Sequence, residues 1–180
     1  MSQASPDTQV DVHTTGYINV TAAPTRAPQM RLMRTVKTII TDKALYANGL
    51  PMHATAGSAA VDLLASQDAV LLPGQQVMMD TGLRIFIEDL NYAAIILPRS
   101  GAGTKGLILG NSAGLIDADY QGPLKCCLLN RNTDDRNIII ARGERIAQLL
   151  LIPVIGINFQ EVESFEESER GSGGFGSTGS

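Results

Sequence analysis

Hydrophobic and polar positions alternate along several short stretches of the chain. In 83–88 (LRIFIE), Leu83, Ile85 and Ile87 fall on one face of an extended chain, which is typical of a strand with one buried side. Further short apolar segments of strand length are 93–97, 106–110, 123–130, 137–141 and 146–154. Turn-forming Gly, Pro, Asn and Asp residues separate these segments. The pattern therefore predicts an all-β domain, an antiparallel barrel, sandwich or jelly roll, with at most one short helix.

The two ends of the chain lack this alternation. Residues 1–30 are rich in Thr, Ala, Pro and Gln, which predicts a disordered extension without chemistry. Residues 166–180 are rich in Gly and Ser, and this composition is typical of a flexible tail. A single aromatic residue, Phe175, nevertheless stands among the small residues of that tail. We expect one β domain over 31–165 between the two ends.

Composition narrows the range of functions. A net charge of -4 and a pI near 5.1 argue against a nucleic-acid binder. No apolar run approaches the roughly 20 residues that span a bilayer, and no secretory signal is recognisable. We therefore expect a cytoplasmic protein with neither a membrane nor a nucleic acid as partner.

The chain has few residues for histidine or cysteine chemistry. Cys126 and Cys127 are its two cysteines, and neighbours in a strand point to opposite faces. They form neither a disulfide with each other nor a zinc site, which fits a reducing compartment. The two histidines, His13 and His53, argue against a histidine triad. Chemistry is expected from carboxylates, a bound metal and backbone amides.

Two loop segments carry polar residues that packing alone does not require. In 98–106 (PRSGAGTKG), Arg99 and Ser100 precede a Gly-rich turn, which is either a phosphate cradle or a plain surface turn. In 114–122 (GLIDADYQG), Asp117 directly follows apolar residues at a predicted hairpin tip. A partly desolvated carboxylate there would suit a general base, although a hairpin turn also uses Asp.

Two later segments also leave alternatives open. Gln148 is a neutral polar residue within the apolar segment 142–151, so it either orients a ligand or faces solvent. In the tail, Arg170 could neutralise an anionic ligand and Phe175 could stack on a base. The alternative is a solvated tail with an isolated aromatic residue.

Five segments in this order resemble the five-motif pattern of the trimeric dUTP diphosphatases (dUTPases), of bacterial or phage type. They are 57–66, 98–107, 114–122, 142–151 and 170–179. The resemblance covers the chain from about residue 31 to its end. It implies a β jelly roll, or distorted barrel, that forms a homotrimer with exchanged C-terminal tails. It also implies hydrolysis of dUTP to dUMP and pyrophosphate with Mg²⁺, which limits uracil in DNA and supplies dUMP for dTMP synthesis.

The resemblance also implies a role for individual residues. Asp117 would be the general base and Gln148 would hold the attacking water. Tyr120 would pack on the deoxyribose, and Asp62 would lie near the water shell of Mg²⁺. The substrate-binding residues would be Arg99, Ser100, Gly101, Asn111, Gly114, Leu115, Ile116, Tyr120, Lys125, Arg170, Gly174, Phe175, Gly176 and Ser177.

The chain departs from the family pattern at a few positions. Ala60 stands where the first motif usually has Gly, and Pro123 stands where a polar residue is more usual. Two other classes of function are also considered. A dCTP deaminase shares the fold but needs a catalytic Glu, and none occurs between residues 90 and 143. A regulatory nucleotide sensor would use the pocket for binding and residues 1–30 for a partner.

Overall fold

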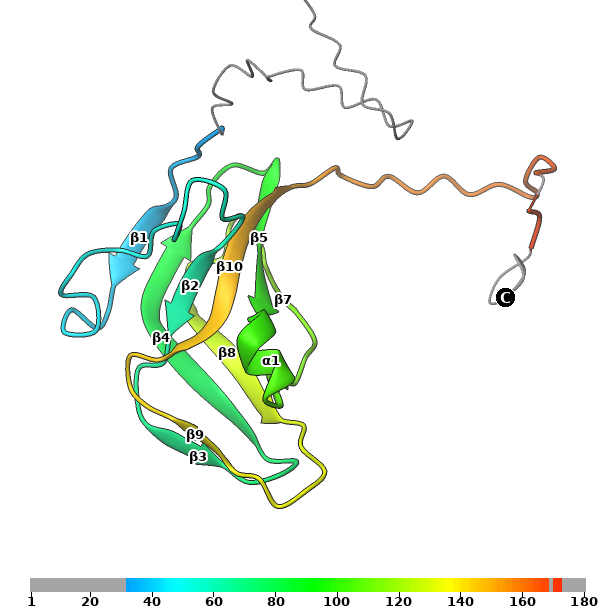
Figure 1. The fold of residues 1–180 in the computed structure, drawn as a ribbon. Helices are drawn as coiled ribbons and strands as arrows, with labels where there is room; N and C mark the ends of the chain where they lie inside the picture. The colour runs from blue at the N-terminus through cyan, green and yellow to red at the C-terminus, as the bar shows by residue number, and fades with distance from the viewer. Residues whose placement is uncertain (1–31, 169, 173–180) are drawn as a thin grey trace, which may run out of the picture. The chain divides into compact units, whose positions relative to one another are not determined.

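Short antiparallel strands make up nearly all of the regular structure. The computed structural model describes residues 32–168 and 170–172, and in this part of the chain ten strands accompany one five-residue helix (Figure 1). The elements are β1 (Lys37–Ile40), β2 (Val61–Leu64), β3 (Ala69–Leu71), β4 (Gln76–Phe86), β5 (Tyr92–Pro98), α1 (Ser100–Thr104), β6 (Leu107–Leu109), β7 (Gly114–Ile116), β8 (Pro123–Asn130), β9 (Ile138–Ile140) and β10 (Arg145–Pro153). The all-β prediction is confirmed. No helix in the described ranges is long and apolar enough to cross a membrane.

The strands form two four-stranded antiparallel sheets and one separate pair. The first sheet has the order β1-β4-β8-β6, the second has the order β2-β10-β5-β7, and β3 pairs with β9. Strands that are neighbours in a sheet are mostly not consecutive in the sequence. The chain therefore passes repeatedly from one sheet to the other, as in a jelly roll.

The alternation seen in the sequence places one face of each sheet in a common core. In β8, Leu124, Cys126 and Leu128 are fully buried, whereas Pro123 and Lys125 are exposed. Buried residues of the second sheet, such as Leu63 and Ile146, belong to the same hydrophobic cluster. Because burial of apolar surface is the main favourable term in folding, this shared cluster holds the two sheets together.

The two cysteines lie as predicted. Both are free; Cys126 is buried and Cys127 is half-buried. Burial raises the pKa of the Cys126 thiol to about 12, and the nearby Asp80 charge adds to that effect. A thiol with so high a pKa stays protonated near neutral pH, so Cys126 serves as a packing residue.

Two local predictions differ from the structure. The segment after Arg99 forms the short helix α1 in place of a simple turn. Residues 117–122 do not close a hairpin, because β7 pairs with β5 whereas β8 pairs with β4 and β6. This segment instead crosses from one sheet to the other, and the strands on either side of it obtain their hydrogen bonds from separate partners.

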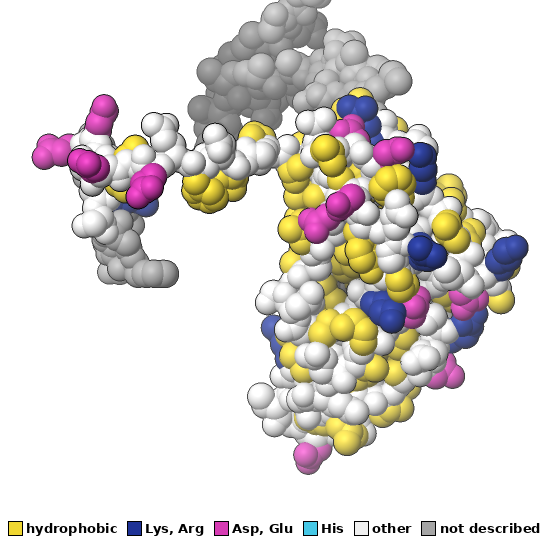
Figure 2. Space-filling model, turned by 180° about the vertical axis from the view of Figure 1, so that it is seen from behind, with side chains coloured by type: hydrophobic (Ala, Val, Ile, Leu, Met, Phe, Trp, Pro, Cys, Tyr) yellow, Lys and Arg dark blue, Asp and Glu magenta, His cyan; other side chains and the backbone are white. Residues whose placement is uncertain are grey.

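Some large apolar side chains remain on the surface of the chain. Ile39 of β1 is 57% exposed, Met78 of β4 is 56% exposed and Leu115 of β7 is 64% exposed. Figure 2 shows apolar side chains spread between charged groups over one face of the molecule. Val70 of β3 and Ile139 of β9 are exposed as well, so a single copy of the chain leaves apolar side chains in water on several of its strands.

Gly82 allows β4 to bulge in the middle of the first sheet. Its φ is +72°, in the region that favours glycine, and the ladder between β4 and β8 shifts register between Asp80 and Arg84. A Cβ at Gly82 would lie 2.8 Å from Cβ of Asp42 and 3.3 Å from Cδ2 of Leu45. Position 82 is therefore restricted by both conformation and space.

We predict that Gly82→Ala destabilises the protein more than Gly74→Ala does. Gly74 has the same sign of φ, at +74°, but a Cβ there meets nothing within 4 Å. Gly74→Ala should cost about 1–2 kcal/mol from conformation alone. Gly82→Ala should lose a further ~1–3 kcal/mol through crowding. Urea unfolding of the two variants at the same protein concentration measures the difference, and equal midpoints would contradict the assignment.

Candidate functional site

A polar cavity of about 500 Å³ opens where β2, β10 and β5 lie side by side. The register sets Gln148 of β10 opposite Asp62 of β2 on one side and opposite Leu97 of β5 on the other. The chain continues from β5 through Arg99 into α1 (Figure 1). The lining residues are Ala54, Ser58, Ala59, Ala60, Asp62, Arg99, Ser100, Gly101, Arg145 and Gln148.

Two arginines share one carboxylate in this cavity. Nε of Arg99 lies 2.7 Å from Oδ1 of Asp62, and Nη1 of Arg145 lies 3.4 Å from Oδ2 of the same residue. The side chains of Arg99 and Asp62 are 29% and 26% exposed, so the pair is partly screened from water. Two guanidinium groups against one carboxylate leave a positive cluster. Such a cluster suits a ligand with phosphate groups, because arginine binds phosphate oxygens through paired donors.

Gln148 is fixed in the wall of the cavity. Its Nε2 donates to the carbonyl of Pro98 at 2.9 Å, and the residue is half-buried. Gln148 therefore lines the cavity and is not on a fully exposed face of the sheet. Ala60 also lines the cavity, and it is not among the described non-glycine residues with positive φ. The alanine thus carries no left-handed strain.

Arg145 lines the cavity but was not predicted as a site residue. It belongs to the segment 142–151, in which Gln148 was the residue predicted for the site. Arg142, in the same segment, has a different environment. Its guanidinium pairs with Asp42 at 2.7 Å and holds the pKa of that carboxyl below its ordinary value. Arg142 therefore connects loops of the scaffold, whereas Arg145 lies in the cavity.

The segment that follows β7 holds the second group of predicted residues. Asp117 is exposed, so the prediction of a partly desolvated carboxylate is wrong for the single chain. The reason is its position at the sheet edge, where the chain leaves β7 to cross between the sheets. The backbone turns here, with the N–H of Tyr120 donating to the carbonyl of Asp117 at 3.2 Å.

Tyr120 is held against its own segment. Its hydroxyl donates to the carbonyl of Pro123 at 3.1 Å, so the unusual proline supplies an acceptor although it lacks an N–H. A Cβ at Gly122 would lie 2.6 Å from Cζ of Tyr120. The ring therefore lies over Gly122, and only glycine leaves room for it.

The other predicted residues near this segment lie in β7, in β8 and between β6 and β7. Gly114, Leu115 and Ile116 form β7. Asn111 is exposed between β6 and β7, and Lys125 is exposed in β8 opposite Asp80. In the tail, Arg170 is exposed. Gly174, Phe175, Gly176 and Ser177 lie outside the described residues.

The two groups of residues lie toward opposite ends of β5. Ile116 pairs with Ala94, and the antiparallel register carries Asp117 further from the cavity. Arg99 follows Ala94 by five residues on the same strand, which is roughly 16 Å at the usual rise per residue. One copy of the chain thus holds the phosphate-type cavity and the candidate base far apart.

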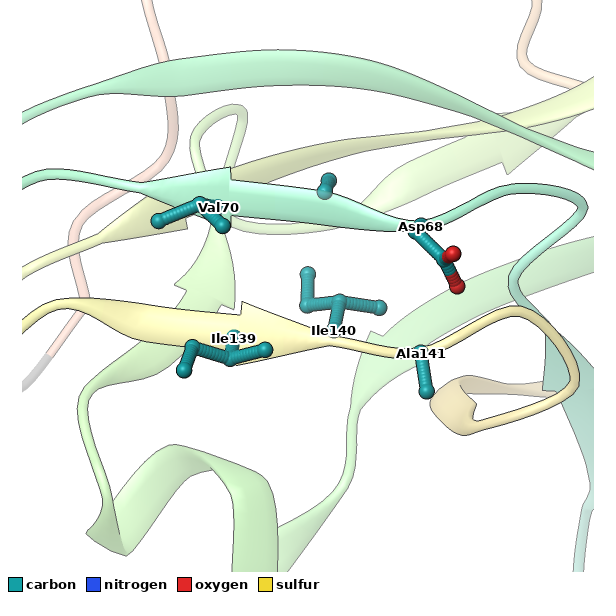
Figure 3. Close-up of a pocket in the computed structure, with 6 residues that line it drawn as sticks. Asp68, Val70, Ile139, Ile140 and Ala141 are labelled. Atoms are coloured by element: carbon teal, nitrogen blue, oxygen red, sulfur yellow. The ribbon is translucent and has the colours of Figure 1, made fainter.

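A second cavity contains none of the predicted residues. It measures about 520 Å³ and lies along the pair β3 and β9 (Figure 3). Figure 3 shows Val70, Ile139 and Ile140 beside it, with Asp68 at one end. Its lining is mainly apolar, so the polar cavity remains the better site for a charged ligand.

The described residues include no group of three or more His, Cys, Asp and Glu that could hold a metal. Asp62 is the single carboxylate of the polar cavity. This set suits Mg²⁺ that is held mainly by substrate phosphates, because Mg²⁺ keeps several waters and needs few protein ligands. A carboxylate such as Asp62 fits a contact to one of those waters.

The fold and the cavity define an all-β protein with a polar cavity in which two arginines form a site suited to a phosphate-bearing ligand. A family model described as dUTPase matches residues 48–179. A deoxyuridine 5'-triphosphate nucleotidohydrolase of Pseudomonas putida is 54% identical over 134 residues, which is 73% of this chain and 87% of that protein. The corresponding protein of Pseudomonas aeruginosa has the same identity and coverage.

Solved structures agree with this match. A dUTPase of Staphylococcus bacteriophage 80alpha, in a structure with dUpNHpp, has a TM-score of 0.71 at 26% identity. It covers 82% of this chain and all of its own. A mutant dUTPase of phage phi11, whose structure is described with a structural Mg(II) ion, has a TM-score of 0.64 at 21% identity and therefore shows likeness of fold.

The chain belongs to the dUTPase family. It is a hydrolase of nucleotide metabolism that acts on dUTP. Its jelly roll is the fold of that family.

We predict that Arg99→Ala lowers kcat/KM for dUTP by roughly 10- to 100-fold, because it removes a charge-assisted contact to phosphate. The fold should survive, since Asp62 keeps Arg145 as a partner. Pyrophosphate release measures the effect. Arg136→Ala is the matched control, because that arginine pairs with Asp134 on the surface. Equal activity of the two variants would contradict the role of Arg99.

Proposed function

We propose that the polar cavity binds the triphosphate of dUTP and that the segment after β7 binds its nucleoside. Arg99, Ser100 and Arg145 hold phosphate oxygens, and Gln148 holds the attacking water. Support comes from the paired arginines at Asp62 and from the anchored amide of Gln148. Positioning and charge neutralisation are the main needs of phosphoryl chemistry, and this set supplies both.

The nucleoside end of the site uses the turn at 117–122. Tyr120 packs on the deoxyribose and leaves no room for a 2′-hydroxyl. Asn111, the backbone of Gly114–Ile116 and Lys125 contribute to binding of the uracil end. The Tyr120 ring has a fixed position over Gly122, which supports this role. A ring can exclude the extra hydroxyl of a ribose only if the ring itself does not move.

Each active site is completed between copies of the chain in a homotrimer. Ile116 pairs with Ala94, so Asp117 lies further from Arg99 along the sheet than the roughly 16 Å between Ala94 and Arg99, and in this proposal another copy brings its Asp117 to the phosphates. The exposed apolar residues Ile39, Met78 and Leu115 support association of copies. The tail of a third copy, with Arg170, Gly174, Phe175, Gly176 and Ser177, closes over the nucleotide.

The reaction is a single hydrolytic displacement. Asp117 takes a proton from a water molecule as that water attacks the α-phosphorus. The bond from the α-phosphorus to the bridging oxygen breaks, and dUMP and pyrophosphate leave. Asp62 would contact the water shell of a bound Mg²⁺, and the ion would neutralise phosphate charge. Closure of the tail excludes bulk water and strengthens the remaining charge interactions.

The biological role follows from the reaction. Removal of dUTP limits uracil in DNA, and the product dUMP is the precursor for dTMP. We place the protein in the cytoplasm, where its nucleotide substrate is found, and the two free cysteines are compatible with a reducing compartment.

We predict that Asp117→Asn reduces kcat for dUTP by at least about 100-fold, as expected for loss of a general base. Binding of a non-hydrolysable dUTP analogue should stay within a few-fold of wild type, because amide and carboxylate have nearly the same shape. Single-turnover kinetics and calorimetry measure the two effects. Asp119→Asn, two residues away on the same turn, is the control and should keep its activity. Full activity of Asp117→Asn would refute the assigned base.

A further inference from the structure

The turn at 117–122 is attached to the neighbouring sheet near the end of β4. Nε of Arg84 donates to the carbonyl of Gln121 at 2.8 Å, and the backbone N–H of Glu88 donates to the carbonyl of Ala118 at 2.9 Å. Ala118 and Gln121, whose carbonyls accept these bonds, flank Tyr120 in the sequence. Arg84 belongs to β4, and no residue of β4 lines the polar cavity.

The attachment at Glu88 has an unusual backbone. Its φ is +67°, a conformation that costs a non-glycine residue free energy and persists only where surrounding contacts hold it. Its N–H bond to Ala118 is one such contact, and the ion pair of its carboxylate with Lys37 at 2.6 Å is another. Strained residues of this kind are often found where a structure fixes a functional loop.

Pro123 makes the side-chain contact of Arg84 more important. In the ladder between β4 and β8, Arg84 is the residue opposite Pro123, immediately after a register shift. Pro123 has no N–H to donate to that ladder. The guanidinium of Arg84 instead holds the chain two residues earlier, at Gln121. Pro123 in turn accepts the hydroxyl of Tyr120.

We propose that Arg84 is a positioning residue for nucleoside selection, an inference that rests on the role of Tyr120 proposed above. Arg84 does not touch the substrate. It fixes the carbonyl of Gln121, and through it Gly122 and the Tyr120 ring that lies over Gly122. Loss of this bond lets the ring move, so the site admits a ribose more easily and binds deoxyribose less well.

The test compares Arg84→Met, which keeps an apolar stem without a donor, with Arg84→Lys, which keeps a donor. In Arg84→Met, kcat/KM for dUTP should fall roughly three- to tenfold, as expected for one hydrogen bond, mainly through a higher KM. The ratio of kcat/KM for dUTP to that for UTP should fall by a similar factor. Arg84→Lys should restore most of both values. Gly122→Ala, which displaces the ring directly, should lower the ratio as well.

Controls separate positioning from general stability. Arg136→Met removes a surface arginine elsewhere and should leave the ratio unchanged. Hydrogen–deuterium exchange of a peptide that covers 117–123 should be faster in Arg84→Met than in wild type, and unchanged in Arg136→Met. This difference should not depend on which substrate is present. A merely structural role would lower the melting temperature without a change in the ratio.

Each contrary result has a distinct meaning. The inference would be overturned by any one of three results. These are wild-type selectivity in Arg84→Met, equal defects in the Met and Lys variants, and unchanged hydrogen–deuterium exchange over 117–123. A wild-type enzyme that hydrolyses UTP as well as dUTP would instead refute the role of Tyr120, and the inference with it.

Discussion

The register between β5 and β7 is the constraint on which the site depends. It sets Ile116 opposite Ala94, whereas Arg99 follows the far end of the same strand. Strand geometry then places Asp117 more than roughly 16 Å from Arg99, and no side-chain rotation closes such a gap. A water-activating carboxylate must reach hydrogen-bond distance of its water. In the proposed mechanism, catalysis on dUTP therefore depends on association of copies, because the base and the phosphate-binding arginines come from different copies.

Both ends of the site are built on rigid elements. Asp62, Arg99 and Arg145 hold one another in position at adjacent strand ends before any ligand arrives. The turn with Tyr120 is held by two hydrogen bonds to its carbonyls, one from Arg84 of β4 and one from Glu88 just after that strand. Preorganised donors and walls of this kind favour both rate and selectivity, because little free energy is lost in ordering them at the moment of binding.

The sequence predicted the parts of the structure that depend on local pattern. Alternation in 83–88 correctly placed Leu83, Ile85 and Ile87 on a buried face, and the apolar segment 123–130 was correctly predicted as a strand, with Cys126 more buried than its neighbour Cys127. Three of the five motifs supply Asp62, Arg99 and Gln148, which line one cavity.

The structural features that could not be predicted from the sequence depend on contacts between residues far apart in the chain. The 117–122 turn was predicted as a hairpin, because its composition does not reveal that β7 and β8 pair with strands of different sheets. The exposure of Asp117 follows from the same topology. Arg145 and Arg84 act through partners more than 30 residues away, Asp62 and Gln121, which no local pattern indicates.

Mixed assemblies give the most direct test of the shared site. Chains with Asp117→Asn and chains with Arg99→Ala, each strongly impaired alone, are unfolded together in equal amounts and refolded, and dUTP hydrolysis is measured. Suppose that each site takes Asp117 from one copy and Arg99 from another. Each of these two residues is then wild type in half of the sites, so about a quarter of the sites have both wild-type residues. We predict recovery to about that fraction of wild-type activity. Activity no higher than the mean of the two separate variants, in assemblies proven to be mixed, would contradict the account.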